Sequence, residues 1–278
     1  MFYQDTDFDV AASCDGLFAD KKIHVTHISE IESAMFTDGA TITDVHQNVL
    51  GSCWLLSAII AVVNCDKDYF QSKISYDDDW KVVIQFANEE IIIDGYIPCI
   101  EENGQMKPIS ACPQDEAWIP LLCKGVVKYL SLHPDNITSQ KMKKLGLAQG
   151  VPHYEYINGG TPDMFWNPMI GGESKILYTC PQIHQVMVQS GVSNTAMVGL
   201  SRGKTDRQIV NGIVCNHAYA ILGLYRIAGE QVLKIQNPWQ KCEPSNKFSR
   251  YCEADDGMFF MSLAEYSFYF PHTVFCSL

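Results

Sequence analysis

The sequence lacks the patterns that mark several common classes of protein. Its 11 cysteines include no C-x-x-C pair, which argues against a zinc ribbon and against a thioredoxin-type site. It has no basic run, and its 32 Asp and Glu residues outnumber its 20 Lys and Arg residues, giving a net charge of −12. Because nucleic-acid binding needs clustered positive charge, nucleic acid is not expected as a partner.

The sequence also lacks a long apolar run and an export signal. The longest apolar run, Trp54 to Val63, has about half of the roughly 20 residues that a membrane span needs. The N-terminus, Met1 to Asp9, is acidic and has neither the basic nor the apolar region of a signal peptide. We therefore expect a soluble, cytoplasmic chain with reduced cysteines and no membrane span.

The chain does have enough apolar residues for a large core. Of its 278 residues, 47% are hydrophobic and 19% are charged, which excludes disorder and fits one large domain or two small ones. The apolar residues from Leu50 to Val63 run almost all round a helix and predict a buried one, capped by Ser52. The pattern also predicts a helix over 116–132, a hairpin over 81–86 and 90–94, a short helix near 181–190, and strands over 195–200, 219–225 and 231–236.

These elements predict an α+β fold with a helical first half and a strand-rich second half. A polar stretch, 133–150, and the pair Gly159-Gly160 lie between the two halves. We place the boundary near Gly160. The predicted lobes are therefore 1–160, which contains the helix at 50–63, and 161–278.

One cysteine stands in a context that suits a nucleophile. Cys53 falls on the first turn of the predicted buried helix, where the helix dipole and unpaired N–H groups lower the pKa of a thiol. The side-chain N–H₂ of Gln47 could join the Cys53 backbone N–H as an oxyanion hole. The segment Gly51-Ser-Cys-Trp54 also keeps part of the signature around the papain nucleophile.

The partners that such a nucleophile needs follow in the required order. His217 begins a predicted strand and Asn237 ends the next one, and a turn at Ala228-Gly229 would bring the two side by side. The Asn237 side-chain oxygen could then accept from one ring nitrogen and leave the other for Cys53. Trp239 would cover that bond from water. Singly, each residue has an ordinary structural interpretation as a core thiol, a structural histidine or a turn; their order favours nucleophilic catalysis.

These segments together resemble the two-lobed cysteine protease core of the calpains. The matching stretches are Asp38 to Asp44, Gln47 to Leu56, Asp115 to Trp118, Tyr154 to Gly160, His217 to Tyr219, Asn237 to Trp239 and Asp256 to Ser262. The resemblance implies a papain-like fold in which a helical N-terminal lobe and a β-rich C-terminal lobe meet at a cleft. It also implies an endopeptidase that acts on protein or peptide substrates, with no regulatory partner indicated.

The resemblance further implies roles for particular residues. The implied triad is Cys53, His217 and Asn237, with Gln47 as the oxyanion donor, and the implied substrate cleft includes Gly160, Asn216 and Trp239. The family also implies calcium, which prefers carboxylate and carbonyl oxygens, and the implied ligands in the N-terminal lobe are Gly39, Asp44 and Glu116. In the C-terminal lobe, Met258 stands where the family has an acidic residue. A thioether is a poor calcium ligand, so we expect that second site to be lost.

Departures from the family pattern keep other functions open. Asn216 replaces the glycine before the histidine and places a side chain where substrate would pass. This favours, as an alternative, a catalytically silent relative that acts as a protein-binding or regulatory module. A third hypothesis is acyl transfer to an amine by the same Cys–His pair, which the protease-like motifs disfavour.

Overall fold

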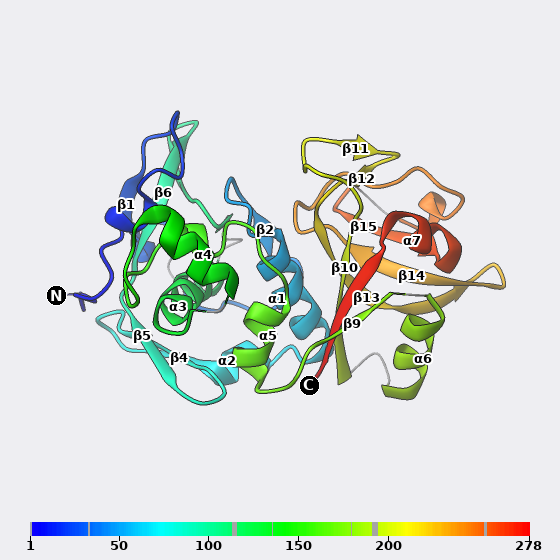
Figure 1. The fold of residues 1–278 in the computed structure, drawn as a ribbon, viewed down its shortest axis with the longest axis horizontal. Coiled ribbons are helices and arrows are strands. Elements are labelled where there is room, and N and C mark those ends of the chain that lie inside the picture. The colour runs from blue at the N-terminus through cyan, green and yellow to red at the C-terminus, as the bar shows by residue number, and fades with distance from the viewer. Residues whose placement is uncertain are drawn as a thin grey trace. The chain divides into compact units, whose positions relative to one another are not determined.

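The structure, a computed structural model, describes residues 2–32, 34–112, 116–134, 136–178, 180–190, 194–252 and 255–278. Asp115, in one of the stretches that carry the resemblance, lies outside the described residues. The predicted α+β class is confirmed, because helices predominate in the first half of the chain and one large sheet dominates the second (Figure 1).

The chain divides into two compact units. The N-terminal unit consists of Met1–Ser52 and Asp68–Gly160, and the C-terminal unit of Cys53–Lys67 and Thr161–Leu278. The helix that begins at Cys53 therefore groups with the strand-rich part of the chain, whereas we expected it with 1–160. The physical reason is that this helix hydrogen-bonds to strands of the large sheet through Ser57 and Asn64.

Among its described residues, the N-terminal unit combines three small sheets with helices. Its sheets, all antiparallel, are β1 (His24–His27), β6 (Tyr96–Glu102) and β7 (Gln105–Pro108); β3 (Ile74–Tyr76), β4 (Val82–Gln85) and β5 (Glu90–Ile93); and β2 (His46–Gln47) with β8 (Ala111–Cys112). Its α-helices are α2 (Tyr69–Lys73), α3 (Trp118–Leu132) and α4 (Asn136–Leu145), and its 3₁₀ turns are η1 (Ala12–Cys14), η2 (Ile28–Glu30) and η3 (Tyr154–Tyr156).

Helix α3 lies in the core of the N-terminal unit and carries a buried lysine. Lys124, on the first half of α3, is fully buried, and its ammonium group forms an ion pair with Asp94. The same ammonium group donates to the carbonyl oxygen of Tyr96 at 2.7 Å. Because burial opposes the charged form, the pKa of Lys124 is lowered, although the Asp94 carboxylate raises it.

The C-terminal unit is built on one six-stranded antiparallel sheet in the order β15-β14-β13-β10-β16-β9. The strands are β9 (Lys175–Leu177), β10 (Thr195–Leu200), β13 (Ala218–Ile227), β14 (Glu230–Gln236), β15 (Met258–Ser262) and β16 (His272–Ser277). The remaining elements are α1 (Cys53–Cys65), α5 (Asp163–Ile170), α6 (Cys180–Ser190), α7 (Leu263–Tyr269), the turn η5 (Ser249–Tyr251) and the small hairpin of β11 (Ile209–Val210) and β12 (Ile213–Val214). Within this unit, α1 packs on β10 and β13.

The predicted helices and strands are present with shifted ends. The helix predicted over 50–63 runs from Cys53 to Cys65, and the hairpin predicted over 81–94 is β4 and β5. The turn predicted at Ala228-Gly229 has both residues at positive φ, 50° and 85°, the conformation that a two-residue hairpin of right-twisted strands requires. The polar stretch 133–150, for which no element was predicted, contains α4.

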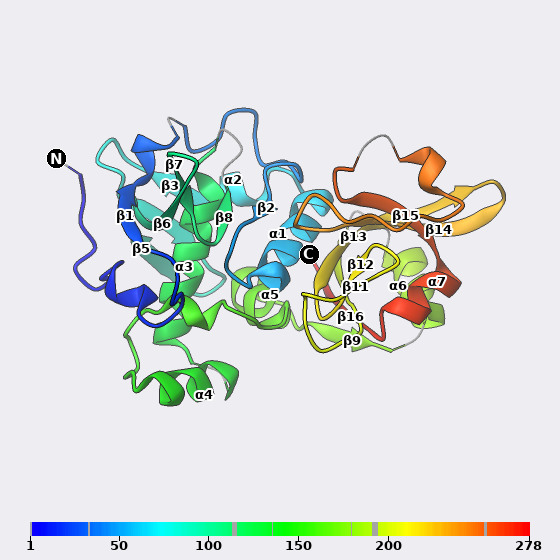
Figure 2. The same cartoon turned by 90° about the horizontal axis from the view of Figure 1, so that it is seen from above.

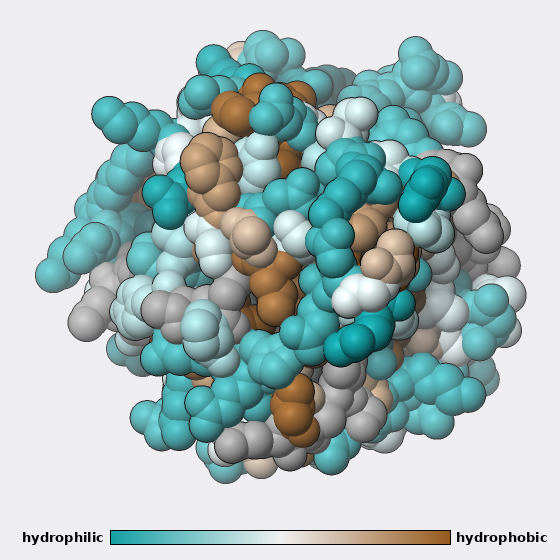
Figure 3. Space-filling model, turned by 90° about the vertical axis from the view of Figure 1, so that its right-hand side faces the viewer, coloured by the Kyte–Doolittle hydropathy of each residue, from teal (hydrophilic) through white to brown (hydrophobic). Residues whose placement is uncertain are grey.

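In the described part of the chain, no helix has the length and apolar character needed to cross a bilayer. In the view of Figure 3, hydrophilic residues cover most of the face, and the hydrophobic residues form separate groups. Scattered exposed apolar residues of this kind are normal for a protein surface.

Candidate active site and acidic cluster

The first turn of α1 is anchored to the start of β13. Cys53 and Ser57 lie one turn apart on α1, so their side chains leave the same face of the helix. The Ser57 hydroxyl donates to the carbonyl oxygen of Ala218 at 3.0 Å. The backbone N–H of Ala218 interacts with the Cys53 thiol. Ala218 therefore contacts α1 through its carbonyl oxygen and its N–H group, and His217 is the residue directly before it.

The side chain of Asn237 determines which nitrogen of His217 carries a proton. Asn237 Oδ1 lies 2.8 Å from His217 Nε2 and accepts the backbone N–H of Trp239 at 3.0 Å. Asn237 Nδ2 donates to the carbonyl oxygen of Lys241 at 2.7 Å. These two bonds orient the amide, so the oxygen faces the imidazole. Because that oxygen only accepts, Nε2 is the protonated nitrogen and Nδ1 is left as a proton acceptor.

The imidazole of His217 is enclosed by aromatic rings. His217 is 3% exposed, and Asn237 is fully buried. The ring centroid lies 4.6 Å from that of Trp239 and 5.1 Å from that of Tyr219. Burial lowers the pKa of His217 to about 4, although the bond to Asn237 and the charge of Asp206 raise it. The imidazole is therefore neutral at pH 7.

The thiol of Cys53 is also neutral at pH 7. Burial raises its pKa to about 11, although the backbone N–H groups of Ala218 and Trp54 lower it. The lowered pKa expected for Cys53 from its place at the start of a helix is therefore wrong. The reason is that loss of solvation outweighs the N–H groups at this helix end. Within the described part of the chain, no hydrogen bond joins the sulfur directly to the His217 ring.

Gln47 lies on β2 in the N-terminal unit and is 8% exposed. Its Nε2 donates to the carbonyl oxygen of Leu50 at 2.8 Å, which uses one of its two protons. Its Oε1 is buried and, among the described residues, has no hydrogen-bond partner. The nearby hydroxyl of Ser52, predicted as a helix cap, donates instead to the carbonyl oxygen of Ser110 at 3.0 Å.

The residues predicted for the substrate cleft lie in different units. Gly160 ends the N-terminal unit, after Gly159, whose N–H donates to the carbonyl oxygen of Gly51 at 2.7 Å. Asn216 and Trp239 belong to the C-terminal unit. Asn216 is exposed, and its backbone has a φ of 48°, a left-handed conformation that asparagine tolerates better than most residues. Trp239 is partly buried against the His217 ring.

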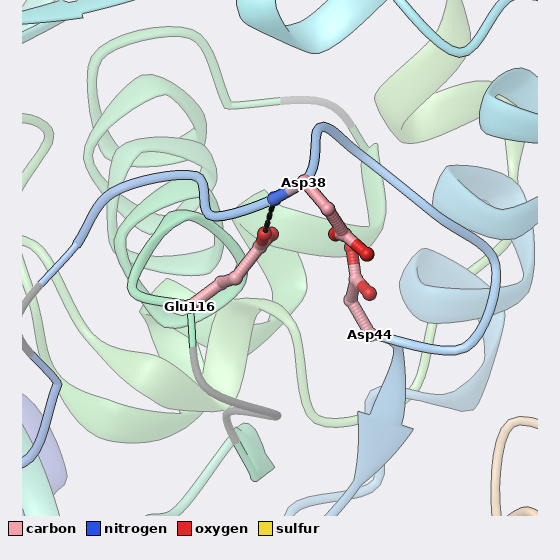
Figure 4. A group of neighbouring side chains, drawn as sticks. All are labelled: Asp38, Asp44 and Glu116. Carbon is pink, nitrogen blue, oxygen red and sulfur yellow. Dashed lines mark hydrogen bonds between the residues drawn. The ribbon is translucent and has the colours of Figure 1, made fainter.

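Three carboxylates of the N-terminal unit gather into an acidic cluster. Oxygen atoms of Asp38, Asp44 and Glu116 lie within 4.8 Å of one another (Figure 4). The sequence predicted Asp44 and Glu116 for this site but missed Asp38, although it stands only six positions before Asp44. Gly39, which was predicted, has no side chain to offer and could contribute only its backbone carbonyl.

The acidic cluster is held by N–H donors. Glu116 accepts the backbone N–H of Asp38 at 3.1 Å, and the indole N–H of Trp118 lies 2.9 Å from Glu116 and 3.3 Å from Asp44. Burial raises the pKa of Glu116, and the Asp44 charge raises it further, although the N–H donors lower it. A divalent cation would offset this repulsion, so the donor set fits a hard cation such as calcium.

In the C-terminal unit, where the second calcium site was expected to be lost, the carboxylates of Glu243 and Asp256 accept backbone N–H groups. One carboxylate oxygen of Glu243 accepts the backbone N–H groups of Asp256 and Gly257, both at 2.9 Å. Asp256 in turn accepts the backbone N–H of Met258 at 2.9 Å. Across the described ranges, the acidic cluster of the N-terminal unit is the only group of three or more His, Cys, Asp or Glu side chains close enough to share an ion.

Comparison with protein-family models shows which family this chain belongs to. The family model described as "Calpain family cysteine protease" matches residues 4–277. The chain belongs to this family. Among curated proteins, this calpain-family domain is similar to calpain-12 of Mus musculus, with 24% identity over 85% of this chain and 34% of the relative. It is also similar to the calpain-2 catalytic subunit of Gallus gallus, with 22% identity over 86% of this chain and 36% of the relative.

A further relative is calpain-8 of Rattus norvegicus, with 24% identity over 86% of this chain and 36% of the relative. The calpain-family domain described here thus spans about a third of the length of these curated relatives. The match of the family over nearly the whole chain confirms the resemblance inferred from the motifs.

Proposed function

We propose that this domain is a cysteine endopeptidase that cleaves protein or peptide substrates through Cys53, His217 and Asn237. The observation that carries the proposal is the oriented amide of Asn237, which leaves Nδ1 of His217 as a proton acceptor. A histidine in a merely structural role does not need this tautomer. The anchoring of Ala218 to the first turn of α1 supports the pairing of His217 with Cys53.

In the proposed reaction, the Cys53 sulfur attacks the peptide carbonyl carbon while its proton moves to Nδ1 of His217. The resting pair is neutral, so charge develops during this step rather than before it. Asn237 Oδ1 holds the Nε2–H of the imidazolium that forms. The Cys53 backbone N–H and the second Nε2 proton of Gln47 are proposed to bind the oxyanion.

The intermediate then collapses with cleavage of the C–N bond, and the imidazolium of His217 gives its proton to the leaving amine. The thioester on Cys53 is hydrolysed by water, whose proton passes to Nδ1 of His217. The C–S bond breaks, the thiolate recovers that proton, and the carboxylic acid product leaves. Trp239, against the imidazole, is proposed to exclude water from the His217–Asn237 bond, and Gly160 and Asn216 to border the substrate.

Calcium is proposed to bind the acidic cluster through Asp38, Asp44 and Glu116, with the Gly39 carbonyl as a further ligand. Bound there, calcium would supply positive charge that stabilises this part of the N-terminal unit. It takes no part in the proton transfers, which belong to His217. We also propose a cytoplasmic location, supported by free thiols at the nine cysteines whose side chains the structure describes.

The proposal is tested by labelling with an epoxide-type cysteine-protease inhibitor and by cleavage of casein. We expect one label, on Cys53, and loss of cleavage in Cys53→Ala. Cys65→Ala is the matched control, because Cys65 ends the same helix and burial also raises its pKa to about 11. Cleavage that survives Cys53→Ala, or that is lost equally in Cys65→Ala, would contradict the assigned nucleophile.

A second candidate is a catalytically silent protein-binding module. Two observations favour it: no hydrogen bond joins Cys53 and His217 among the described residues, and the exposed Asn216 directly precedes His217 in the chain. Catalytic bonds are often long in substrate-free sites, so the first of these does not decide between the candidates. The same assay separates them, since a silent module would neither take the label at Cys53 nor cleave casein.

A further inference from the structure

Lys141, on α4, lies among four backbone carbonyl groups. Its Nζ atom is close to the carbonyl oxygens of Glu155 (2.9 Å), Tyr156 (3.3 Å), Asn158 (3.0 Å) and Gly159 (2.5 Å), which we call the carbonyl cage. An ammonium group has three protons and accepts nothing, so the cage matches it with three strong bonds and one longer contact. Converging carbonyl dipoles repel one another unless a cation lies between them.

The loop that forms the carbonyl cage also holds Gly51. The Oδ1 atom of Asn158 accepts the N–H of Gly51 at 3.2 Å, and the N–H of Gly159 donates to the Gly51 carbonyl at 2.7 Å. Asn158 is itself held by a bond from its Nδ2 to the Glu155 carboxylate at 2.8 Å. A Cβ at position 51 would lie 2.7 Å from Asn158 Oδ1, so a larger residue there would have to displace the Asn158 amide from its bond to the Gly51 N–H.

Lys141 reaches this loop from α4, which also buries the side chains of Thr138 and Met142. Helix α4 is polar, and Figure 2 shows it apart from the sheets of its unit. Its neighbours Lys143 and Lys144 are exposed, whereas Lys141 is partly buried. Of these three lysines, only Lys141 bonds to the loop.

We infer that Lys141 is a positioning residue of the proposed protease. Its ammonium group holds residues 155–159 through the carbonyl cage. The loop in turn holds Gly51, which stands two residues before Cys53 and leads the chain into the nucleophile. The inference rests on the proposed function, and Lys141 would act by holding the segment that leads into Cys53 in position.

The kinetic test compares Lys141→Ala with wild type and with Lys144→Ala, an exposed lysine on the same helix. Because a small displacement near a nucleophile is costly, we expect Lys141→Ala to lower kcat/KM for a peptide substrate by at least about tenfold, mainly through kcat. Lys144→Ala should match wild type. A kcat/KM of Lys141→Ala within twofold of wild type would overturn the inference.

Rescue by ammonium separates positioning from a general loss of stability. In Lys141→Ala the carbonyl cage is empty, and ammonium chloride can supply the missing N–H donors, whereas tetramethylammonium chloride has none. We expect ammonium to restore kcat/KM several-fold over the same concentration of tetramethylammonium, with no such difference in wild type or Lys144→Ala. Equal effects of the two salts on Lys141→Ala count against the inference.

Hydrogen exchange provides a readout that does not depend on activity. The amide protons of Gly51 and Gly159 are both bonded within this loop contact, so Lys141→Ala should speed their exchange at least about tenfold relative to Lys144→Ala. If wild type cleaves nothing, the proposed function fails while this measurement still reports on the loop. Unchanged exchange at both glycines would overturn the inference whatever the activity.

Discussion

Alkylation of Cys53 by iodoacetamide as a function of pH tests whether the resting Cys53–His217 pair is neutral. Burial raises the pKa of Cys53 from 9.0 to about 11. At pH 7 a thiol with that pKa is about 0.01% thiolate, against about 1% for a thiol of pKa 9. A more basic thiolate is intrinsically more nucleophilic, by about tenfold over two pKa units. The net expectation is alkylation about tenfold slower than that of an ordinary exposed thiol.

The rate should also rise about tenfold per pH unit between pH 7 and pH 10, because thiolate is the reacting form. Peptide mapping by mass spectrometry follows Cys53 and Cys65 in the same sample, and the pKa of both is raised to about 11. His217→Gln should leave the slope for Cys53 unchanged, because the neutral imidazole contributes no charge. Fast alkylation that is flat from pH 5 to pH 8, and that slows in His217→Gln, would refute the reasoning by revealing a thiolate–imidazolium pair.

Four further predictions concern orientation, burial, protonation and calcium. Asn237→Ala removes the acceptor that orients His217, so kcat on a peptide substrate should fall by about 10- to 100-fold with little change in KM; a kcat within twofold of wild type would contradict the role. Lys124→Met leaves the Asp94 carboxylate buried without its cation and should lower the free energy of unfolding in urea by about 3–5 kcal/mol. The double variant Lys124→Met/Asp94→Asn should recover part of this loss, and equal losses in both variants would argue against the ion pair. The pKa of His217 is about 4 in the folded chain and 6.5 in the unfolded chain, so the unfolded chain binds more protons between these pH values. The free energy of unfolding should therefore fall by up to about 3 kcal/mol as the pH drops from 6.5 to 4, and His217→Gln should remove this pH dependence. Calcium should raise the melting temperature by a few degrees at about tenfold over its Kd, and Glu116→Gln but not Asp256→Asn should abolish the shift; an equal shift in both variants would place the ion elsewhere.

The parts of the candidate site that the sequence predicted depend on short-range patterns. His217 and Asn237 flank two strands joined by a two-residue turn, so their proximity follows from the length of one hairpin and the glycine at position 229. The helix that begins at Cys53 follows from its continuous apolar character. In both cases the controlling interactions lie within about 20 residues of chain, where periodicity and turn residues are informative.

Other parts of the site depend on contacts between distant segments. Asp38 meets Glu116 across 78 positions, and Gly51 meets Asn158 across 107. Helix α4 was not predicted because its sequence is polar, yet its Lys141 supplies the cation for the carbonyl cage. Pairings over such separations have no signature in local periodicity, because any of many polar residues could have occupied either position.

By itself, the sequence determined the α+β class, the family, and the order of the proposed nucleophile, the histidine and the asparagine along the chain. Only the tertiary structure decided the direction in which the pKa values of Cys53 and His217 shift. A helix start predicts a lowered pKa for Cys53, but the pKa is raised, because desolvation depends on everything packed around the sulfur and not on its place in the helix. The orientation of Asn237 was likewise decided by the Trp239 N–H and the Lys241 carbonyl, since a side-chain amide has no preferred direction until donors and acceptors surround it.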